Sequence, residues 1–324
     1  MPSPVPANSD SDVSLDDFEA CLAAVEWNSS QPLAGAFGPD SVSWRVNRES
    51  ALFLGAGRAA LLQLAHPWVA AALDQHSSLL QNPIARFHNT FRVVFTMSFG
   101  SAPQALAAAR SLHHLHTRIR GSLPASVAGY AKGSPYEANQ IPALRWVLAT
   151  LVESAVIAYE SLMPPLTDAE RASYYAESKT LAALFGIPPD ALPPDWRSFK
   201  SYIAGMCQSQ ALGVSERSLY MAHRLLAGAG SWVIPPRWYR ALTAEWMPPR
   251  FRVEFGLVYG PADELSATRA HRWLPKLYKE LPPAIRFVGP YHEAQARLAH
   301  RQTGFLTRRS NQFWIGEPRL PFNE

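Results

Sequence analysis

Apolar positions recur along most of the chain at the three- and four-residue spacing of α-helices. The segment SLDDFEACLAAVEW predicts a helix that starts at Ser14, because a capping serine and early acidic residues precede its apolar face. From Val42 onward the helical pattern continues almost to the C-terminus. Strand-like alternation is nearly absent, and Arg252–Tyr259 is its best candidate. The pattern therefore predicts an all-α fold.

Prolines, glycines and capping residues divide the pattern into separate helices. One apolar run, ESALFLGAGRAALLQLAHP, ends at Pro67, which then occupies the first turn of the helix PWVAAALDQHS. The helix ARFHNTFRVVFTMSFG is ended by Gly100. The next helix has Ser101 as its cap and is predicted to end at Gly121.

Two further long helices complete the central part of the chain. One is predicted over Ile141–Leu162, and one from Thr167, which begins a capping box, to Gly186. Proline pairs separate shorter helices in the C-terminal half. Residues 1–13, rich in Pro, Ser and Asp, are expected to be a disordered tail. Residues 14–324 are expected to form a single compact all-helical domain.

Composition and charge exclude several classes of protein. The 324 residues are 48% apolar and include ten tryptophans, enough for a large core. The net charge of +4 is spread along the chain without a block of five Lys or Arg, so nucleic acid is not an expected partner. The two cysteines, Cys21 and Cys207, lie far apart and form no disulfide framework, which indicates a reducing compartment.

Membrane insertion and the common hydrolytic motifs are also not predicted. The N-terminus carries no signal-peptide pattern. The most apolar stretch, Trp146–Tyr159, is interrupted by Glu153 and is shorter than the roughly 20 residues of a spanning helix. We therefore expect no transmembrane segment and a cytoplasmic protein. GxSxG, HExxH and P-loop motifs are absent from the sequence.

A histidine lies on the apolar stripe of the helix SAPQALAAARSLHHLHTRIRG. Ala105, Ala109, Leu112, His116 and Ile119 recur at spacings of three and four, so they share one face. Two interpretations remain open from this pattern. His116 is either a core histidine that a hydrogen bond satisfies or the axial ligand of a haem iron, which needs only one protein ligand.

Two polar residues share a face of the apolar helix ARFHNTFRVVFTMSFG. Because apolar side chains occur on nearly every side, this helix is predicted to be buried. Arg86 and Thr90 are spaced i and i+4 within it. A buried guanidinium requires an anion. That anion is either a protein carboxylate or a haem propionate.

The segment GAGRAALLQLAHPWVAAALDQHS supplies two more candidates. Its glycines, Gly55 and Gly57, do not complete a dinucleotide-binding fingerprint. Gln63 and His66 are polar residues within the apolar stretch, and His66 directly precedes Pro67 at a helix–helix corner. His66 either caps the preceding helix or reaches a ligand pocket.

The order of motifs along the chain resembles that of a known protein family. The segment WRVNRESALFLGAGRAALLQLAHPWVAAALDQHS is followed by ARFHNT, HTRIRG, LRWVLATLVESAVIAYESLMPPLTDAE and LPPAIRFVGPYHEAQAR. This order, from Ser43 to Arg297, resembles the MpaB-type oxygenases, whose best-known branch is the rubber oxygenases or latex-clearing proteins. The resemblance implies an all-helical, globin-reminiscent fold that encloses one haem b.

The resemblance also implies roles for individual residues. His116 in HTRIR matches the proximal haem ligand of the rubber oxygenases, and Arg86 with Thr90 matches an R-x-x-x-T motif of their haem pocket. This chain has Asn89 where those proteins have a lysine, and their catalytic glutamate has no counterpart, since the role is not transferred to Asp74. A smaller apolar substrate is therefore expected in place of polyisoprene.

These observations lead to a set of functional hypotheses. The first is a haem b-dependent oxygenase that uses dioxygen on an apolar, isoprenoid-like substrate, with His116 on the iron. Arg86 and Thr90 act on the catalytic side, and Gln63 and His66 line the cofactor pocket. The alternatives are a non-catalytic haem or lipid carrier or sensor, and a haem peroxidase-like activity.

Overall fold

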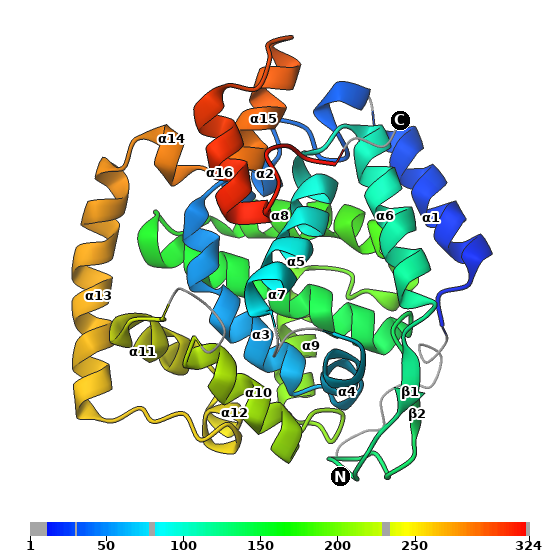
Figure 1. Cartoon of the computed structure of the whole chain (residues 1–324), viewed down its shortest axis with the longest axis vertical. Coiled ribbons are helices and arrows are strands. Elements are labelled where there is room, and N and C mark those ends of the chain that lie inside the picture. The colour runs from blue at the N-terminus through cyan, green and yellow to red at the C-terminus, as the bar shows by residue number, and fades with distance from the viewer. Residues whose placement is uncertain (1–11, 30, 78–81, 229–233, 322–324) are drawn as a thin grey trace.

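Helices account for nearly all regular structure in the computed structural model, which describes residues 12–29, 31–77, 82–228 and 234–321 (Figure 1). The all-α prediction is confirmed. The helices within these residues are α1 (Leu15–Asn28), α2 (Val42–Asn47), α3 (Ala56–Leu64), α4 (Pro67–His76), α5 (Pro83–Phe99), α6 (Ala102–His116), α7 (Ile141–Leu162), α8 (Asp168–Leu184), α9 (Trp196–Gln208), α10 (Glu216–Leu226), α11 (Arg237–Trp246), α12 (Pro249–Glu254), α13 (Pro261–Glu280), α14 (Pro283–Arg286), α15 (Gly289–Leu298) and α16 (Phe305–Ile315). The strands β1 (Arg120–Ser122) and β2 (Pro135–Glu137) form one antiparallel pair.

The predicted helix caps are confirmed at three N-termini. The side chains of Ser14, Ser101 and Thr167 each accept a hydrogen bond from the backbone N–H three residues later. Each cap satisfies an N–H that has no partner within its own helix. Local sequence signals therefore set where these helices begin.

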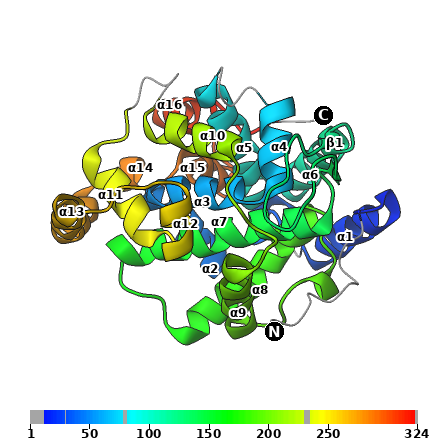
Figure 2. The same cartoon turned by 90° about the horizontal axis from the view of Figure 1, so that it is seen from below.

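Helix α7 crosses the middle of the molecule, and α3 packs directly on it (Figures 1 and 2). The two backbones come close at Gly55, where an added Cβ would lie 2.5 Å from the carbonyl oxygen of Ser154. Gly55 also divides the apolar run that the sequence predicts as one helix into a 3₁₀ turn over Ser50–Leu54 and α3. The absence of a side chain at Gly55 therefore allows the chain to pack closely on α7.

Glu153, which interrupts the apolar stretch of α7, belongs to a buried ion-pair network. Glu153 and Arg58 are both nearly fully buried, and the guanidinium donates to the carboxylate at 2.5 Å. Lys200 of α9 pairs with the other carboxylate oxygen, and Arg58 also donates to the backbone oxygen of Trp246 at 2.9 Å. Burial of these charges is tolerated because each one is paired and hydrogen-bonded.

Helix α7 is longer than the apolar stretch seen in the sequence. Its 22 residues and mean hydropathy of 1.6 make it long and apolar enough to cross a membrane, by length and composition alone. Yet 67% of its most apolar window is buried inside the protein. Its surroundings are therefore those of a central core helix.

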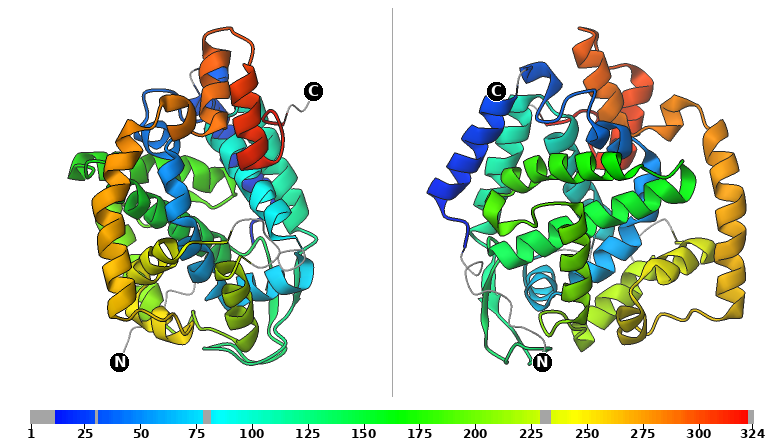
Figure 3. Two further views of the ribbon diagram at one scale, coloured as in Figure 1. Left: turned by 60° about the vertical axis from the view of Figure 1, so that its left-hand side comes forward. Right: turned by 180° about the vertical axis from the view of Figure 1, so that it is seen from behind.

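The remaining helices cover this centre from several sides. Helix α13 stands along one edge, where it packs on α11 and α7 (Figures 1 and 3). Helices α5 and α6 form an antiparallel pair on the other side, with α1 outside α6 and α16 against α5 (Figure 1). Of the expected tail, residues 1–11 lie outside the described residues, whereas Val13 is buried and its N–H donates to the backbone oxygen of Asn139 at 3.0 Å.

Two predictions of secondary structure are wrong. Helix α6 ends at His116 and not at Gly121, because the chain beyond it enters β1, where Gly121 pairs with Tyr136 of β2. The candidate strand Arg252–Tyr259 overlaps helix α12 instead. Phe251 and Phe255 are both fully buried, and their i, i+4 spacing suits a helix.

Candidate active site

The α5–α6 hairpin brings two of the predicted residues together. Its turn lies at Gly100 and Ser101. Arg86 precedes Gly100 by fourteen residues (100 − 86), and His116 follows Ser101 by fifteen (116 − 101). At a helical rise of 1.5 Å per residue, both lie about 21–23 Å from the turn. Antiparallel packing therefore places Arg86 and His116 at the same end of the pair.

The side chain of Arg86 is half-buried and unpaired. Its guanidinium makes no hydrogen bond or ion pair with any residue that the structure describes, and desolvation lowers its pKa. Arg86 shares a helical face with Thr90, Val93 and Met97, and the last two pack in the main hydrophobic core. No carboxylate from the described residues therefore pairs with this cation.

The predicted complete burial of α5 is wrong for its first half. Only Phe95–Phe99 are buried, whereas Arg86 and Thr90 are half-buried and Asn89 is exposed. In that half, Phe87 and Phe91 pack against Phe53, with ring centroids 5.4 and 4.7 Å from it. The sequence shows that these positions are apolar, but it cannot show which of them lack a covering neighbour.

His116 is the last residue of α6 and shares its face with Ala105, Ala109 and Leu112. Its pKa is lowered to about 4, first by desolvation and then by the positive charge of Arg86, while a hydrogen bond with the Asn139 side chain acts in the opposite direction. The imidazole is therefore neutral at physiological pH. A neutral imidazole has the lone pair that metal coordination requires.

The neighbouring histidine, His113, has the role of a core residue. It is buried, and its ring stacks on Phe18 with centroids 4.2 Å apart. His114 is exposed and contacts Arg118. The three histidines of α6 therefore have three different environments, and the charge of Arg86 acts on the pKa of His116.

Thr90 lies one helical turn after Arg86. Its hydroxyl donates to the backbone oxygen of Arg86 at 3.0 Å. This bond occupies the single hydroxyl proton and leaves the oxygen's lone pairs able to accept. To donate to a ligand instead, the hydroxyl must rotate away from the helix.

Gln63 and His66 interact with residues other than Arg86 and His116. Gln63 donates to the hydroxyl of Thr150 at 3.0 Å. His66 is 1% exposed, and burial lowers its pKa to about 3. Within the described ranges, no hydrogen bond, ion pair or ring contact links either residue to Arg86 or His116.

Of the two roles predicted for His66, capping of the preceding helix is not observed. Within the described part of the chain, its side chain makes no hydrogen bond to a backbone oxygen of α3, and its Nδ1 has no partner. The ring lies beside Trp68 and Tyr130, with centroids 5.5 and 6.5 Å away. His66 is therefore a buried neutral histidine that is held mainly by aromatic packing.

Asn139 is the site residue that the sequence did not reveal. It is 5% exposed and follows β2, and its side chain contacts the end of α6. No local motif marks it, since a lone asparagine before a helix is a common turn residue. The pairing of two three-residue strands returns the chain to the end of α6, where Asn139 interacts with His113 and His116.

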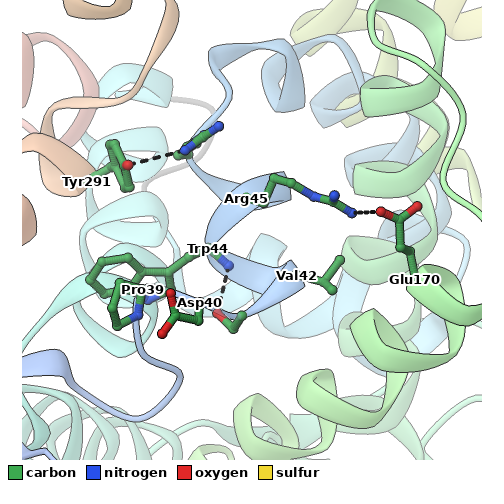
Figure 4. A pocket seen from close by; sticks show the side chains of 9 residues that line it. Pro39, Asp40, Val42, Trp44, Arg45, Glu170 and Tyr291 are labelled. Carbon is green, nitrogen blue, oxygen red and sulfur yellow. Dashed lines mark hydrogen bonds and ion pairs between the residues drawn. The ribbon is translucent and has the colours of Figure 1, made fainter.

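A cavity of about 250 Å³ lies elsewhere, where α2, α8 and α15 meet (Figure 4). The two arginines in its lining have partners there: Arg45 binds Glu170 at 2.6 Å, and Arg48 donates to the hydroxyl of Tyr291 at 3.2 Å. Pockets for larger organic ligands have volumes of about 300–1,000 Å³ and mainly apolar walls. This cavity suits neither a haem nor a large apolar substrate.

Comparison with known families decides what kind of protein this is. Residues 44–276 match the family described as "ER-bound oxygenase mpaB/B'/Rubber oxygenase, catalytic domain". The chain belongs to this family. The mpaB/rubber oxygenase match runs from α2 into α13, includes every candidate residue named above, and supports an oxygenase function. No curated protein and no solved structure matches the chain.

The residues around His116 fit the requirements of a haem. Haem iron needs one axial protein ligand, and its propionates are anions that arginine binds well. The end of the α5–α6 hairpin has a neutral imidazole and a half-buried guanidinium that pairs with no carboxylate among the described residues. No group of three or more His, Cys, Asp or Glu side chains suited to a metal ion occurs in the described residues.

Proposed function

We propose that the protein is a haem b-dependent oxygenase that uses dioxygen to oxidise an apolar substrate. One observation carries the proposal: Arg86, a cation that has no anion among the residues with described positions, lies beside His116, an imidazole that desolvation keeps neutral. Both features cost folding free energy and are compensated when a ligand supplies an anion and a metal. The family's oxygenase function gives that ligand a chemical purpose.

The chain's own residues have distinct roles in this proposal. Bound haem supplies the binding and activation of dioxygen. His116 would hold the iron through one ring nitrogen, and Arg86 would bind a propionate or orient dioxygen. Thr90 would donate a hydrogen bond to dioxygen after its hydroxyl turns from the Arg86 carbonyl. Val93 and Leu112, which pack against the main core, exclude water from the site.

Apolar side chains near Arg86 support the proposed substrate class. Half-buried aromatic rings of Phe53, Phe87 and Phe91 cover one side of α5 next to the Arg86–Thr90 face. Such a surface favours hydrocarbon over polar substrates. Isoprenoids are the first class to test, and substrates smaller than polyisoprene are expected to react best.

The test combines a spectrum with an oxygen electrode. Purified protein is titrated with haem, and oxygen uptake is then followed with isoprenoids from monoterpene to polyisoprene length. A Soret band together with substrate-dependent uptake supports the oxygenase. Haem binding without uptake would favour a carrier or sensor, and turnover with hydrogen peroxide and a chromogenic donor alone would favour a peroxidase-like activity. Absence of a Soret band would contradict the haem oxygenase, the peroxidase-like activity and a haem carrier or sensor.

A further inference from the structure

The β1–β2 hairpin holds Asn139 against the end of α6. Ala138 donates its N–H to the backbone oxygen of Ile119 at 2.9 Å, next to the Arg120–Glu137 pair of the hairpin. Residue 139 therefore lies beside the last turn of α6, although it is distant from that turn in sequence. The backbone oxygen of Asn139 is fixed as well, because it accepts the N–H of Val13 at 3.0 Å.

The side chain of Asn139 has one defined orientation. Its amide nitrogen donates to the backbone oxygen of His113 at 3.4 Å, and the residue is 5% exposed. An amide presents its two donor hydrogens and its acceptor oxygen on opposite sides. With the nitrogen directed at the His113 oxygen, the amide oxygen is available to accept from the ring of His116, and the Asn139 side chain acts to raise the pKa of that ring.

This arrangement is the one that a histidine ligand needs. When one ring N–H donates to a carbonyl oxygen, the imidazole is held in a single tautomer and orientation, and the other nitrogen keeps its lone pair. The same hydrogen bond makes the ligating nitrogen a stronger donor to the metal. A lone histidine at the end of a helix would otherwise be free to rotate.

We propose that Asn139 is the positioning residue of the haem site: it orients His116, selects its tautomer and strengthens its bond to iron. This inference rests on the proposed function, because it takes His116 as the haem ligand. Its structural part, the control of the imidazole by Asn139, holds in the apoprotein and can be measured there.

The first experiment uses the apoprotein and nitrogen-15 NMR of the histidine side chains. In the wild type, His116 is expected to show a single tautomer. Asn139→Leu removes the acceptor and is expected to give a mixture of both tautomers, whereas Asn139→Asp retains an acceptor and a single tautomer. Asn47→Leu, which removes a half-buried asparagine bonded to Tyr174, serves as the control and leaves His116 unchanged. A single tautomer in Asn139→Leu would overturn the proposal.

The second experiment measures haem binding and the iron–histidine stretching frequency of the ferrous protein. Asn139→Leu is expected to raise the haem dissociation constant about 10- to 100-fold and to lower the frequency. Asn139→Asp is expected to raise the frequency, and Asn47→Leu to leave both quantities unchanged. A purely structural role would lower the melting temperature of the Asn139 variants without moving the frequency, which would contradict the proposal.

The two claims fail in different ways. If His116→Gly binds haem as tightly as the wild type, the ligand assignment is wrong and the role of Asn139 falls with it. If His116→Gly loses haem but both Asn139 variants keep the wild-type frequency and affinity, only the role of Asn139 is wrong. Should Asn139→Leu fail to fold, Asn139→Ser, whose shorter side chain cannot reach the ring, takes its place.

Discussion

Arg86 and His116 meet at the open end of the α5–α6 hairpin, where desolvation and then the charge of Arg86 lower the pKa of the imidazole to about 4. In the protein alone, this arrangement stabilises neither the charge of Arg86 nor the protonated form of His116. The guanidinium has no anion among the described residues, and a cation beside a histidine disfavours its protonation. Residues that break the usual rules of charge pairing are expected at functional sites.

Replacing Arg86 should separate folding from cofactor binding. In Arg86→Met the half-buried charge is lost but no hydrogen bond is, so the free energy of unfolding of the apoprotein stays within about 0.5 kcal/mol of wild type or rises. Haem affinity should fall at least tenfold, because the anion loses its partner. Chemical denaturation and haem titration measure the two effects.

Arg92 of the same helix is the matched control for Arg86. Its guanidinium donates to the backbone oxygen of Ile315 at 3.1 Å, so Arg92→Met should lower the stability of the apoprotein by about 1 kcal/mol and leave haem affinity unchanged. Equal effects of the two substitutions on haem affinity would contradict a specific role for Arg86.

Removing the hydroxyl of Thr90 should slow turnover without removing the cofactor. Thr90→Val is expected to keep the Soret spectrum and to reduce substrate-dependent oxygen uptake tenfold or more, a loss of about 1.4 kcal/mol of transition-state stabilisation. Thr96→Val is the control, because Thr96 also donates to the carbonyl four residues earlier, at 2.7 Å, but is fully buried. Unchanged uptake in Thr90→Val would remove Thr90 from the catalytic residues.

The buried histidine His66 should make the apoprotein sensitive to acid. Burial lowers its pKa from 6.5 to about 3, so between these pH values the unfolded chain binds a proton that the folded chain does not. Stability should therefore fall as pH falls through this window, by up to about 1.4 kcal/mol per pH unit for this group. His116 acts in the same sense down to about pH 4.

The substitution His66→Leu isolates that contribution. The decrease in the free energy of unfolding between pH 6.5 and pH 4 should be smaller in this variant by about 2–3 kcal/mol. Denaturant melts at a series of pH values measure it. An identical pH dependence in His66→Leu and wild type would show that another group controls the acid sensitivity.

Local signals in the sequence predict much of the fold. Ser101 and Thr167 cap their helices as predicted, and α7 has the predicted limits, because caps, prolines and helical periodicity act within a few residues. The end of α6 was not predictable in this way. It depends on the pairing of Gly121 with Tyr136, a long-range contact between strands too short to show a period of two.

The sequence predicted only the part of the candidate site that depends on local helical spacing. Helical spacing placed Arg86 and Thr90 on one face and His116 on an apolar stripe, and the hairpin turn at Gly100 brings these faces together. Whether Arg86 has a protein anion depends on tertiary contacts, as does the position of Asn139. Sequence periodicity carries no information on either.

The most direct test of the site is haem binding by His116→Gly, compared with His114→Gly, which makes the same backbone change at an exposed position of the same helix. We predict that His116→Gly loses the Soret band of the bound haem and that added imidazole restores it, whereas His114→Gly binds haem like the wild type. A wild-type Soret band in His116→Gly without imidazole would contradict the assignment of His116 as the haem ligand.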